Sequence, residues 1–141
     1  MSTAKLKPGT TILVVDDTPE ILTVVKKMLA YTLNATVVCA ENGQIAKDII
    51  LGREKSFDLI FTDLEMPVMD GRQFAEWIRV TEPRTPIIML TGEHARISPE
   101  DRPDVDVFLP KPVTPDTLVI YVTSLIPRCI VESAPIARVV A

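Results

Sequence analysis

The chain has 141 residues, of which 47% are hydrophobic and 24% are charged, and its formal net charge at pH 7 is −4. This length fits one domain with a core of ordinary size, and it is too short for a catalytic domain joined to a separate output domain. The apolar content excludes disorder over the whole chain. The net negative charge argues against direct binding to nucleic acid, because that binding needs clustered Lys and Arg.

Cysteine, histidine and apolar runs exclude several other classes. Cys39, Cys129 and the single histidine His94 are too few for a disulfide scaffold or for a zinc site made of Cys and His. The apolar run 12–15 stops at two aspartates and is too short for a signal-peptide core. No apolar stretch approaches the roughly 18 residues that a membrane helix needs. We therefore expect a reduced, cytoplasmic protein that has no membrane contact.

Short apolar runs alternate with helical patterns along the chain. Five runs predict strands, and four of them are nearly continuous in apolar residues, as strands buried on both faces of a parallel sheet are. The predicted strands are residues 11–15, 35–39, 58–62, 86–90 and 105–109. Short connections between parallel strands require right-handed crossovers, so helices should cover both faces of the sheet.

Helix-start residues open each of the helical patterns. The first pattern covers residues 18–32 and has Pro19 at its opening. The second follows Asn42, a probable N-cap, and the third begins at Asp70. The last covers residues 114–126, with Thr114 as its cap. Helices therefore follow the first, second, third and fifth strands.

The last helix and the segment before the fifth strand are less regular. Most apolar side chains of the last helix fall on one broad face that includes Tyr121, but Ile120 lies among the polar ones. That pattern is compatible with a wide core-facing stripe or with a partner or dimer surface. Pro99 and Pro103 interrupt residues 92–104, so the fourth helix of the fold should be short or irregular. The residues after Pro127 show no period, and a packed appendage, a linker or a strand-like contact all remain open.

Polar residues follow the strands at one rim of the predicted sheet. Any one of them alone is more often a helix cap or a turn residue, but five together favour a site. Two carboxylates about 4 Å apart repel by roughly 4 kcal/mol at an effective dielectric of about 20, so three need a cation or a shifted pKa. Oxygen ligands favour Mg²⁺. These residues are Asp16, Asp17, Asp63, Thr91 and Lys111.

Four separated motifs give the chain a family resemblance. They are VVDD (14–17), DLEMPVMDG (63–71), LTG (90–92) and FLPKP (108–112). Together they resemble the receiver domain of two-component response regulators. The resemblance implies an α/β fold with a five-stranded parallel sheet in the flavodoxin-like order 2-1-3-4-5 and helices on both faces. It covers residues 10–127 and leaves 1–9 as an N-terminal extension and 128–141 as a C-terminal tail.

The resemblance also implies roles for the rim residues. Asp63 would accept a phosphoryl group from a phosphohistidine, with Mg²⁺ held by Asp16, Asp17, Asp63 and the backbone carbonyl of Glu65. Lys111 would pair with one phosphoryl oxygen, and the Thr91 hydroxyl would donate to another.

A second set of implied features concerns the switch. Phe108 would turn inward as Thr91 moves and so change a partner-binding surface. Pro112 resembles the cis proline of the family, which would direct Lys111 into the site. Glu65 and Glu93 depart from the usual pattern beside the acceptor, and they are compatible with repelling the donor, positioning a water or facing solvent.

Two functional classes follow from these features. The first is a signalling receiver that is not an enzyme. Its partners would be a sensor histidine kinase or phosphotransfer protein and an unknown downstream protein, with a possible phosphorylation-dependent homodimer. The Met1 start and the short tail favour a stand-alone protein over a part of a longer regulator or hybrid kinase. The alternative is a Mg²⁺-dependent phosphohydrolase with Asp63 as nucleophile, although Asp16 and Asp17 lack the DxD spacing of haloacid-dehalogenase enzymes.

Overall fold

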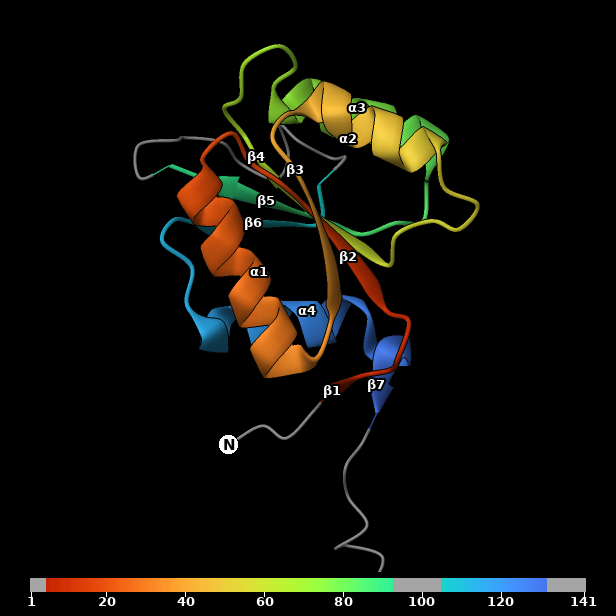
Figure 1. The fold of residues 1–141 in the computed structure, drawn as a ribbon, viewed down its shortest axis with the longest axis vertical. Helices are drawn as coiled ribbons and strands as arrows, with labels where there is room; N and C mark the ends of the chain where they lie inside the picture. Colours follow the sequence, from red (N-terminus) through yellow and green to blue (C-terminus); the bar gives the residue numbers. More distant parts are fainter. Residues whose placement is uncertain (1–4, 93–104, 132–141) are drawn as a thin grey trace, which may run out of the picture.

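A parallel sheet of five strands lies between two layers of helices (Figure 1). The computed structural model describes residues 5–92 and 105–131. The strand order is β3-β2-β4-β5-β6, which is the predicted order 2-1-3-4-5 when only these five strands are numbered. The strands are β2 (Thr11–Val15), β3 (Thr36–Ala40), β4 (Leu59–Asp63), β5 (Ile87–Thr91) and β6 (Val107–Pro110).

The predicted strand positions are confirmed, with small shifts at the ends. β2 has the predicted bounds, whereas β3, β4 and β5 each begin and end one residue later, and β6 begins two residues later and ends one residue later than predicted. For β3 the reason is a hydrogen bond, because the Ala35 amide donates to the Leu29 carbonyl and so closes the preceding helix. Before β4, Asp58 bonds to Thr11 through both its side chain and its amide: its carboxylate accepts from the Thr11 amide, and its own amide donates to the Thr11 carbonyl.

Three of the four helices begin at the predicted cap residues. Asn42 accepts a hydrogen bond from the amide at the third helical position, and so does Thr114. Asp70 forms a capping box with Gln73, in which each side chain accepts from the other residue's amide. The helices are α1 (Pro19–Leu33), α2 (Gly43–Leu51), α3 (Gly71–Thr81) and α4 (Pro115–Leu125).

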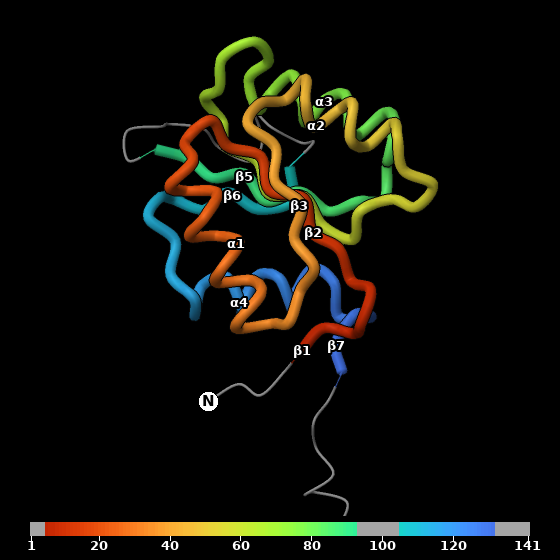
Figure 2. Tube along the Cα trace, viewed as in Figure 1, coloured from red at the N-terminus to blue at the C-terminus, as the bar shows by residue number. Residues whose placement is uncertain are grey.

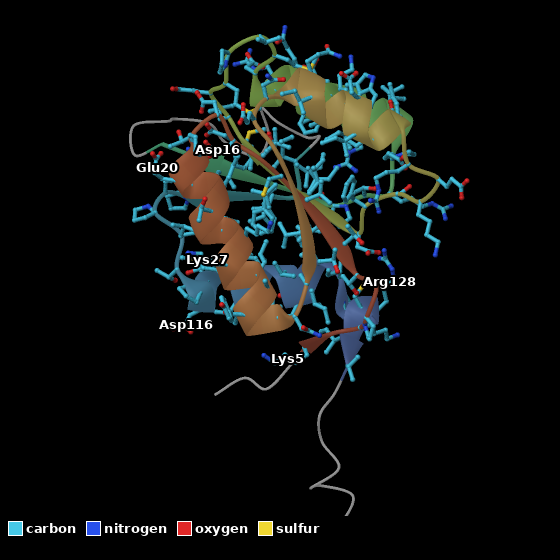
Figure 3. The ribbon with its side chains drawn as sticks, in the orientation of Figure 1. Lys5, Asp16, Glu20, Lys27, Asp116 and Arg128 are labelled. Atoms are coloured by element: carbon cyan, nitrogen blue, oxygen red, sulfur yellow. The ribbon has the colours of Figure 1, made fainter. Side chains whose placement is uncertain are left out.

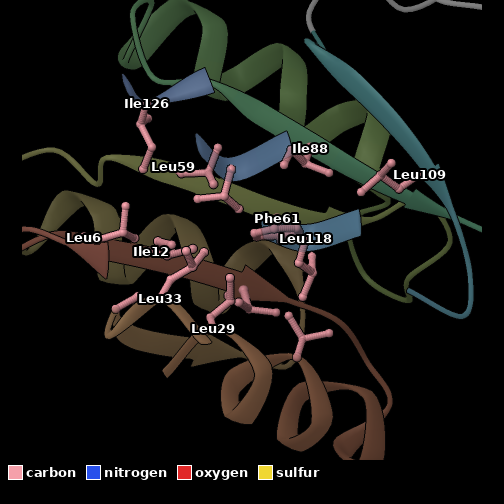
Figure 4. Close-up of a cluster of buried hydrophobic side chains, with 14 of the residues drawn as sticks. Leu6, Ile12, Leu29, Leu33, Leu59, Phe61, Ile88, Leu109, Leu118 and Ile126 are labelled. Atoms are coloured by element: carbon pink, nitrogen blue, oxygen red, sulfur yellow. The ribbon is translucent and has the colours of Figure 1, made fainter. Parts of the chain in front are cut away.

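The two sheet faces carry two separate cores. Ile12 and Val14 of β2 belong to the core beneath α1 and α4, which is shown in Figure 4. Leu13 and Val15 belong to the core beneath α2 and α3. Successive side chains of a strand point to opposite faces, so a strand that serves both cores must be apolar at every position. This is why the central strands have no polar alternation.

The exposed side of α4 differs in part from the prediction. Leu118 and Val122 are buried, but Tyr121 is 37% exposed, so its placement on the core-facing side was wrong. Within the helix only Leu118 and Val122 are fully buried, so its core-facing stripe is narrower than its apolar sequence suggests. Ile120 is 59% exposed, as expected.

The two ends of the described chain form a second, small sheet. β1 (Lys5–Leu6) pairs antiparallel with β7 (Ile130–Val131), which follows the 3₁₀ turn η2 (Pro127–Cys129). Figure 2 shows these two segments side by side at one end of the molecule. The sequence pattern left this pairing unpredicted, since two-residue strands have no detectable period.

Two further expectations concern the fourth helix and a membrane-spanning helix. The short or irregular fourth helix falls on residues 93–104, which lie outside the described part. Within residues 5–92 and 105–131, no helix combines the length and apolar character that a membrane crossing needs.

Candidate functional site

Three carboxylates meet at the carboxyl ends of β2 and β4, which are neighbours in the sheet. One oxygen from each of Asp16, Asp17 and Asp63 lies within 4.8 Å of the others. Asp16 is 0% exposed and Asp63 is 5% exposed, whereas Asp17 faces solvent. Figure 3 places Asp16 at the end of the molecule where α1 begins, near Glu20. The structure therefore brings together the three acidic residues that the sequence had singled out.

Lys111 reaches the same cluster from the end of β6. Its Nζ lies 2.9 Å from Oδ1 of Asp63 and 3.2 Å from Oδ2 of Asp16. The Lys111 amide donates to the Thr91 carbonyl, which continues the pairing of β5 and β6 beyond the last strand residues. The Lys111–Pro112 peptide bond is cis, as the resemblance implied.

The two oxygens of the Asp16 carboxylate have different neighbours. Its Oδ1 accepts a hydrogen bond of 2.9 Å from the Thr18 amide. Its Oδ2 is buried and faces the Lys111 ammonium, whose Nζ lies 3.2 Å away and is shared with Asp63. One ammonium is thus shared by two carboxylates of a cluster of three, which leaves an excess of negative charge. A hard cation with oxygen ligands fits this position and this set of donors.

The electrostatics of the cluster shift two pKa values. Burial raises the pKa of Asp63 above its usual range, and the Asp16 and Asp17 charges act in the same direction, while Lys111 only partly opposes them. Burial alone would lower the pKa of Lys111, but its hydrogen bond to Asp63 and the Asp63 and Asp16 charges more than offset this and raise it. Lys111 is therefore a cation bound to a site that has an excess of negative charge.

The loop after Asp63 folds back onto the end of β4. The Gly71 amide donates to the Leu64 carbonyl at 2.8 Å. A Cβ atom at Gly71 would lie 2.1 Å from the Asp63 carbonyl oxygen, so only glycine fits there without moving the backbone. The Met69 amide donates to the Pro67 carbonyl and closes a tight turn. Together these contacts hold the segment that follows Asp63 close against the strand end.

Thr91 and Phe108 lie on the neighbouring strands β5 and β6. Leu90 pairs with Asp63 in the sheet register, which places Thr91 one residue further along at the same rim. The Thr91 hydroxyl makes a long hydrogen bond of 3.4 Å to the Leu109 carbonyl. Phe108 is half-buried and packs against the core beneath α2 and α3. Thr91 therefore lies at the same rim as the acidic cluster, and Phe108 lies one strand further along the sheet.

The sequence also singled out two glutamates, Glu65 and Glu93, which follow Asp63 and Thr91 by two positions. The Glu65 side chain is exposed, which agrees with one of the three alternatives left open by the sequence, that it faces solvent. Glu93 lies outside the described residues.

A family model of the response regulator receiver domain matches residues 12–123. The chain belongs to this family. Receiver domains are signalling modules of two-component systems, so the family places this chain outside the usual classes of enzymes.

Relatives and solved structures agree with this assignment. The transcriptional regulatory protein ResD of Bacillus subtilis is 39% identical over 121 residues, which are 84% of this chain and 49% of ResD. The sensor protein GacS of Pseudomonas syringae is 35% identical over 111 residues, 73% of this chain and 12% of GacS. The chain spans less than half of the length of such curated relatives.

Among solved structures, the response regulator TrrA of Thermotoga maritima, determined in complex with Mg²⁺-BeF, is 33% identical. Its TM-score is 0.72, and the alignment covers 82% of this chain and 98% of that one. A receiver domain from Clostridium thermocellum is 28% identical with a TM-score of 0.74, and the alignment covers 84% and 95% of the two chains. These likenesses support the receiver fold and an acidic cluster that is compatible with Mg²⁺.

Sequence reasoning missed one backbone group of the receiver site. The Thr18 amide donates to the Asp16 side chain and holds it in place. An aspartate often accepts from the amide two residues later in an Asx-turn, so the Asp16–Thr18 spacing could have revealed this contact.

Proposed function

We propose that this receiver domain is a phosphorylation-dependent switch in a two-component phosphorelay. Asp63 accepts a phosphoryl group from a phosphohistidine of a sensor histidine kinase or of a phosphotransfer protein. The observation that carries this proposal is the contact of the Asp63 carboxylate with Lys111 inside a cluster that also contains Asp16 and Asp17. A nucleophile, a cation and metal-binding oxygens are the groups that phosphoryl transfer needs in one place.

Mg²⁺ is the metal that this cluster suits. Asp16, Asp17, Asp63 and the main-chain carbonyl of Glu65 would hold it, and the excess of three clustered carboxylates over the one Lys111 ammonium supports that assignment. When bound, Mg²⁺ supplies positive charge that neutralises the phosphoryl oxygens during transfer.

The transfer itself uses the side chains of the chain. A carboxylate oxygen of Asp63 attacks the phosphorus atom, a P–O bond forms, and the P–N bond of the donor breaks. The donor imidazole keeps the electron pair of that bond. Lys111 pairs with a phosphoryl oxygen in the product, because its ammonium already lies 2.9 Å from the attacked carboxylate.

The switch follows from the charge that the acyl phosphate adds. A phosphoryl group brings about −1.5 to −2 charges and three strong acceptor oxygens to the rim. The Thr91 hydroxyl has only a long hydrogen bond to the Leu109 carbonyl, so it can turn to donate to the phosphoryl group instead. Phe108 then follows Thr91 inward and changes the surface over β6. Moving such an equilibrium from 1:99 to 99:1 needs roughly 5.5 kcal/mol of differential interaction.

The donor protein also needs a surface beside the acceptor. A hollow of about 220 Å³ opens between the first turns of α1 and the segment after Lys111. Its lining is mainly apolar and includes Ile21, Val24 and Val113, and Lys111 itself forms part of it. We assign this hollow to the donor, because a protein seated there lies next to the side chain that contacts Asp63.

The test is an intact-mass measurement after incubation with acetyl phosphate and Mg²⁺. We expect one phosphoryl group on the wild-type chain and none on Asp63→Asn. The matched control is Asp48→Asn, which changes an exposed aspartate on α2 and should be labelled like the wild type. Labelling of Asp63→Asn to the wild-type level would refute the proposal.

The same samples separate a switch from an enzyme. One stoichiometric label with no turnover of a phosphomonoester supports the receiver function. Repeated turnover of the phosphomonoester by the wild type, lost in Asp63→Asn, would instead support the phosphohydrolase. Sizing of the labelled and unlabelled protein tests whether phosphorylation drives dimerisation.

A further inference from the structure

The two ends of the described chain meet at the opposite end of the molecule from the acidic cluster. Figure 3 shows Lys5 and Arg128 at that end and Asp16 at the other. In the small sheet there, Lys5 pairs with Val131 and Leu6 with Ile130. The family model matches residues 12–123, so every residue of this sheet lies outside the part that the family shares. These contacts are therefore a feature of this chain to be explained on its own.

The N-terminal strand is docked onto the domain through its own side chains. Leu6 is 1% exposed and belongs to the core that also contains Leu33 and Ile126. The Lys5 ammonium donates to the carbonyls of Tyr31 and Thr32, at 3.3 and 3.0 Å. These carbonyls lie in the last turn of α1, where carbonyl groups lack partners within the helix and attract a positive charge.

The chain after α4 is bound to this strand and to the sheet. The Lys7 amide donates to the Cys129 carbonyl at 2.7 Å, and the Cys129 side chain is buried in the same core as Leu6. Arg128 lies 3.6 Å from one carboxylate oxygen of Asp58. The other oxygen of Asp58 accepts from the Thr11 amide at the start of β2. The 3₁₀ turn is therefore attached both to the chain that follows β1 and, through Asp58, to the start of β2.

We infer that residues 5–7 form a docking surface for the chain segment that follows α4, and that the two together act as a clasp. The clasp comprises β1, η2 and β7. It holds the chain at Val131 beside the C-terminal end of α1, so that any segment attached there starts from a fixed position away from the acidic cluster. This inference does not depend on phosphoryl transfer. The limits of the receiver domain, residues 10 and 127, remain predictions from the sequence.

The clasp should open as a local unit. Strands of two residues have little stability of their own, so its closure depends on the burial of Leu6 and on the contacts of Lys5. Opening it removes the β1–β7 pairing but leaves the five-stranded sheet intact, which is the behaviour of a local unfolding unit. A protease that needs the open form then reports how often the clasp opens.

The test is limited trypsin digestion of the full chain, followed by mass spectrometry. Cleavage after Arg128 requires the clasp to open, whereas cleavage after Lys26 in the middle of α1 requires the domain to unfold. In Leu6→Ala we expect cleavage after Arg128 to be faster by about tenfold, with little change at Lys26. Lys5→Gln keeps the core intact and should give a smaller increase, about threefold, because only the contacts to α1 are lost.

Controls separate the clasp from general destabilisation. Val80→Ala changes an exposed side chain on α3 and should leave both cleavage rates as in the wild type. Equal acceleration at Arg128 and Lys26 in Lys5→Gln would overturn the inference, and so would unchanged cleavage at Arg128 in both variants. Labelling by acetyl phosphate should remain as in the wild type, since neither residue is near Asp63, so a failure of the clasp is distinguishable from a failure of the proposed function.

Discussion

Asp63 combines burial with negative neighbours, and this combination makes its charged form costly to the fold. Its raised pKa means that the folded protein prefers the neutral carboxyl more than the unfolded chain does. Lys111 limits this cost, and its own pKa rises because of the same contacts. The site is thus ready for a further cation, because the one ammonium does not balance three carboxylates.

The first prediction concerns Asp63→Asn in protein without metal. Asparagine resembles the neutral carboxyl, so we expect the variant to melt a few degrees higher than the wild type at pH values above the raised pKa. As the pH falls through that pKa, the folded wild type takes up a proton before the unfolded chain does, and so it gains stability relative to the variant. The difference in melting temperature should therefore shrink. Thermal scans over a pH series measure it, and a difference that grows on acidification contradicts the raised pKa.

The second prediction concerns Val68, at the centre of the turn between Pro67 and Met69. Its φ is 72°, a conformation that disfavours a β-branched side chain, and the side chain is 81% exposed. Val68→Gly should therefore raise the free energy of unfolding by about 1 kcal/mol. Urea unfolding measures this change. Val80→Gly, at an exposed helical position, should instead lower it by about 1 kcal/mol, so stabilisation by both changes would show that backbone strain at residue 68 is not the cause.

At the scale of single elements, α1 contributes to three features of the molecule. The segment before its first turn supplies the Thr18 amide that holds Asp16, and its first turns form one wall of the apolar hollow. Its last turn accepts the contacts of Lys5. One helix of 15 residues thus extends from the acidic cluster to the clasp at the other end.

The third prediction tests the hollow as the donor surface. Val24→Glu places a charge in an apolar lining, so we expect transfer from a phosphohistidine donor protein to slow by about tenfold, which corresponds to about 1.4 kcal/mol. Labelling by acetyl phosphate should not change, because a small donor needs no docking surface. Thr23→Glu is the charge-matched control, since Thr23 is exposed on α1 but does not line the hollow. Equal slowing by both variants would point to net charge rather than to the hollow.

At the scale of the whole molecule, the acidic cluster joins elements that are distant in the chain. Asp16 follows β2, Asp63 ends β4 and Lys111 follows β6, so the site forms only when the sheet is complete. Ligand binding at such a site is linked to global folding, because the unfolded chain does not bring these residues together.

The fourth prediction follows from this linkage. Mg²⁺ at ten times its dissociation constant should stabilise the wild type by about 1.4 kcal/mol. Thermal unfolding with increasing Mg²⁺ measures the effect, and Ca²⁺ at the same ionic strength shows how selective it is. Asp16→Asn should lose most of the Mg²⁺ effect, whereas Asp48→Asn should keep it. Equal stabilisation of all three proteins would indicate a general salt effect.

The sequence by itself determined the strands, the helix caps and the identity of the acidic residues. Continuous apolar runs such as Ile12 to Val15 must be buried on both sides, and residues such as Asn42 and Thr114 satisfy helix amides locally. These features depend on neighbours within a few positions of the chain. The motifs around Asp63 then made the family recognisable.

Only the tertiary structure decided which distant groups touch. The contact of Lys111 with Asp16, the exposed side of Tyr121 and the pairing of Leu6 with Ile130 depend on how helices and loops pack on the sheet. No local pattern encodes such contacts, because their energy comes from burial and charge shared between segments that meet only after the chain has folded.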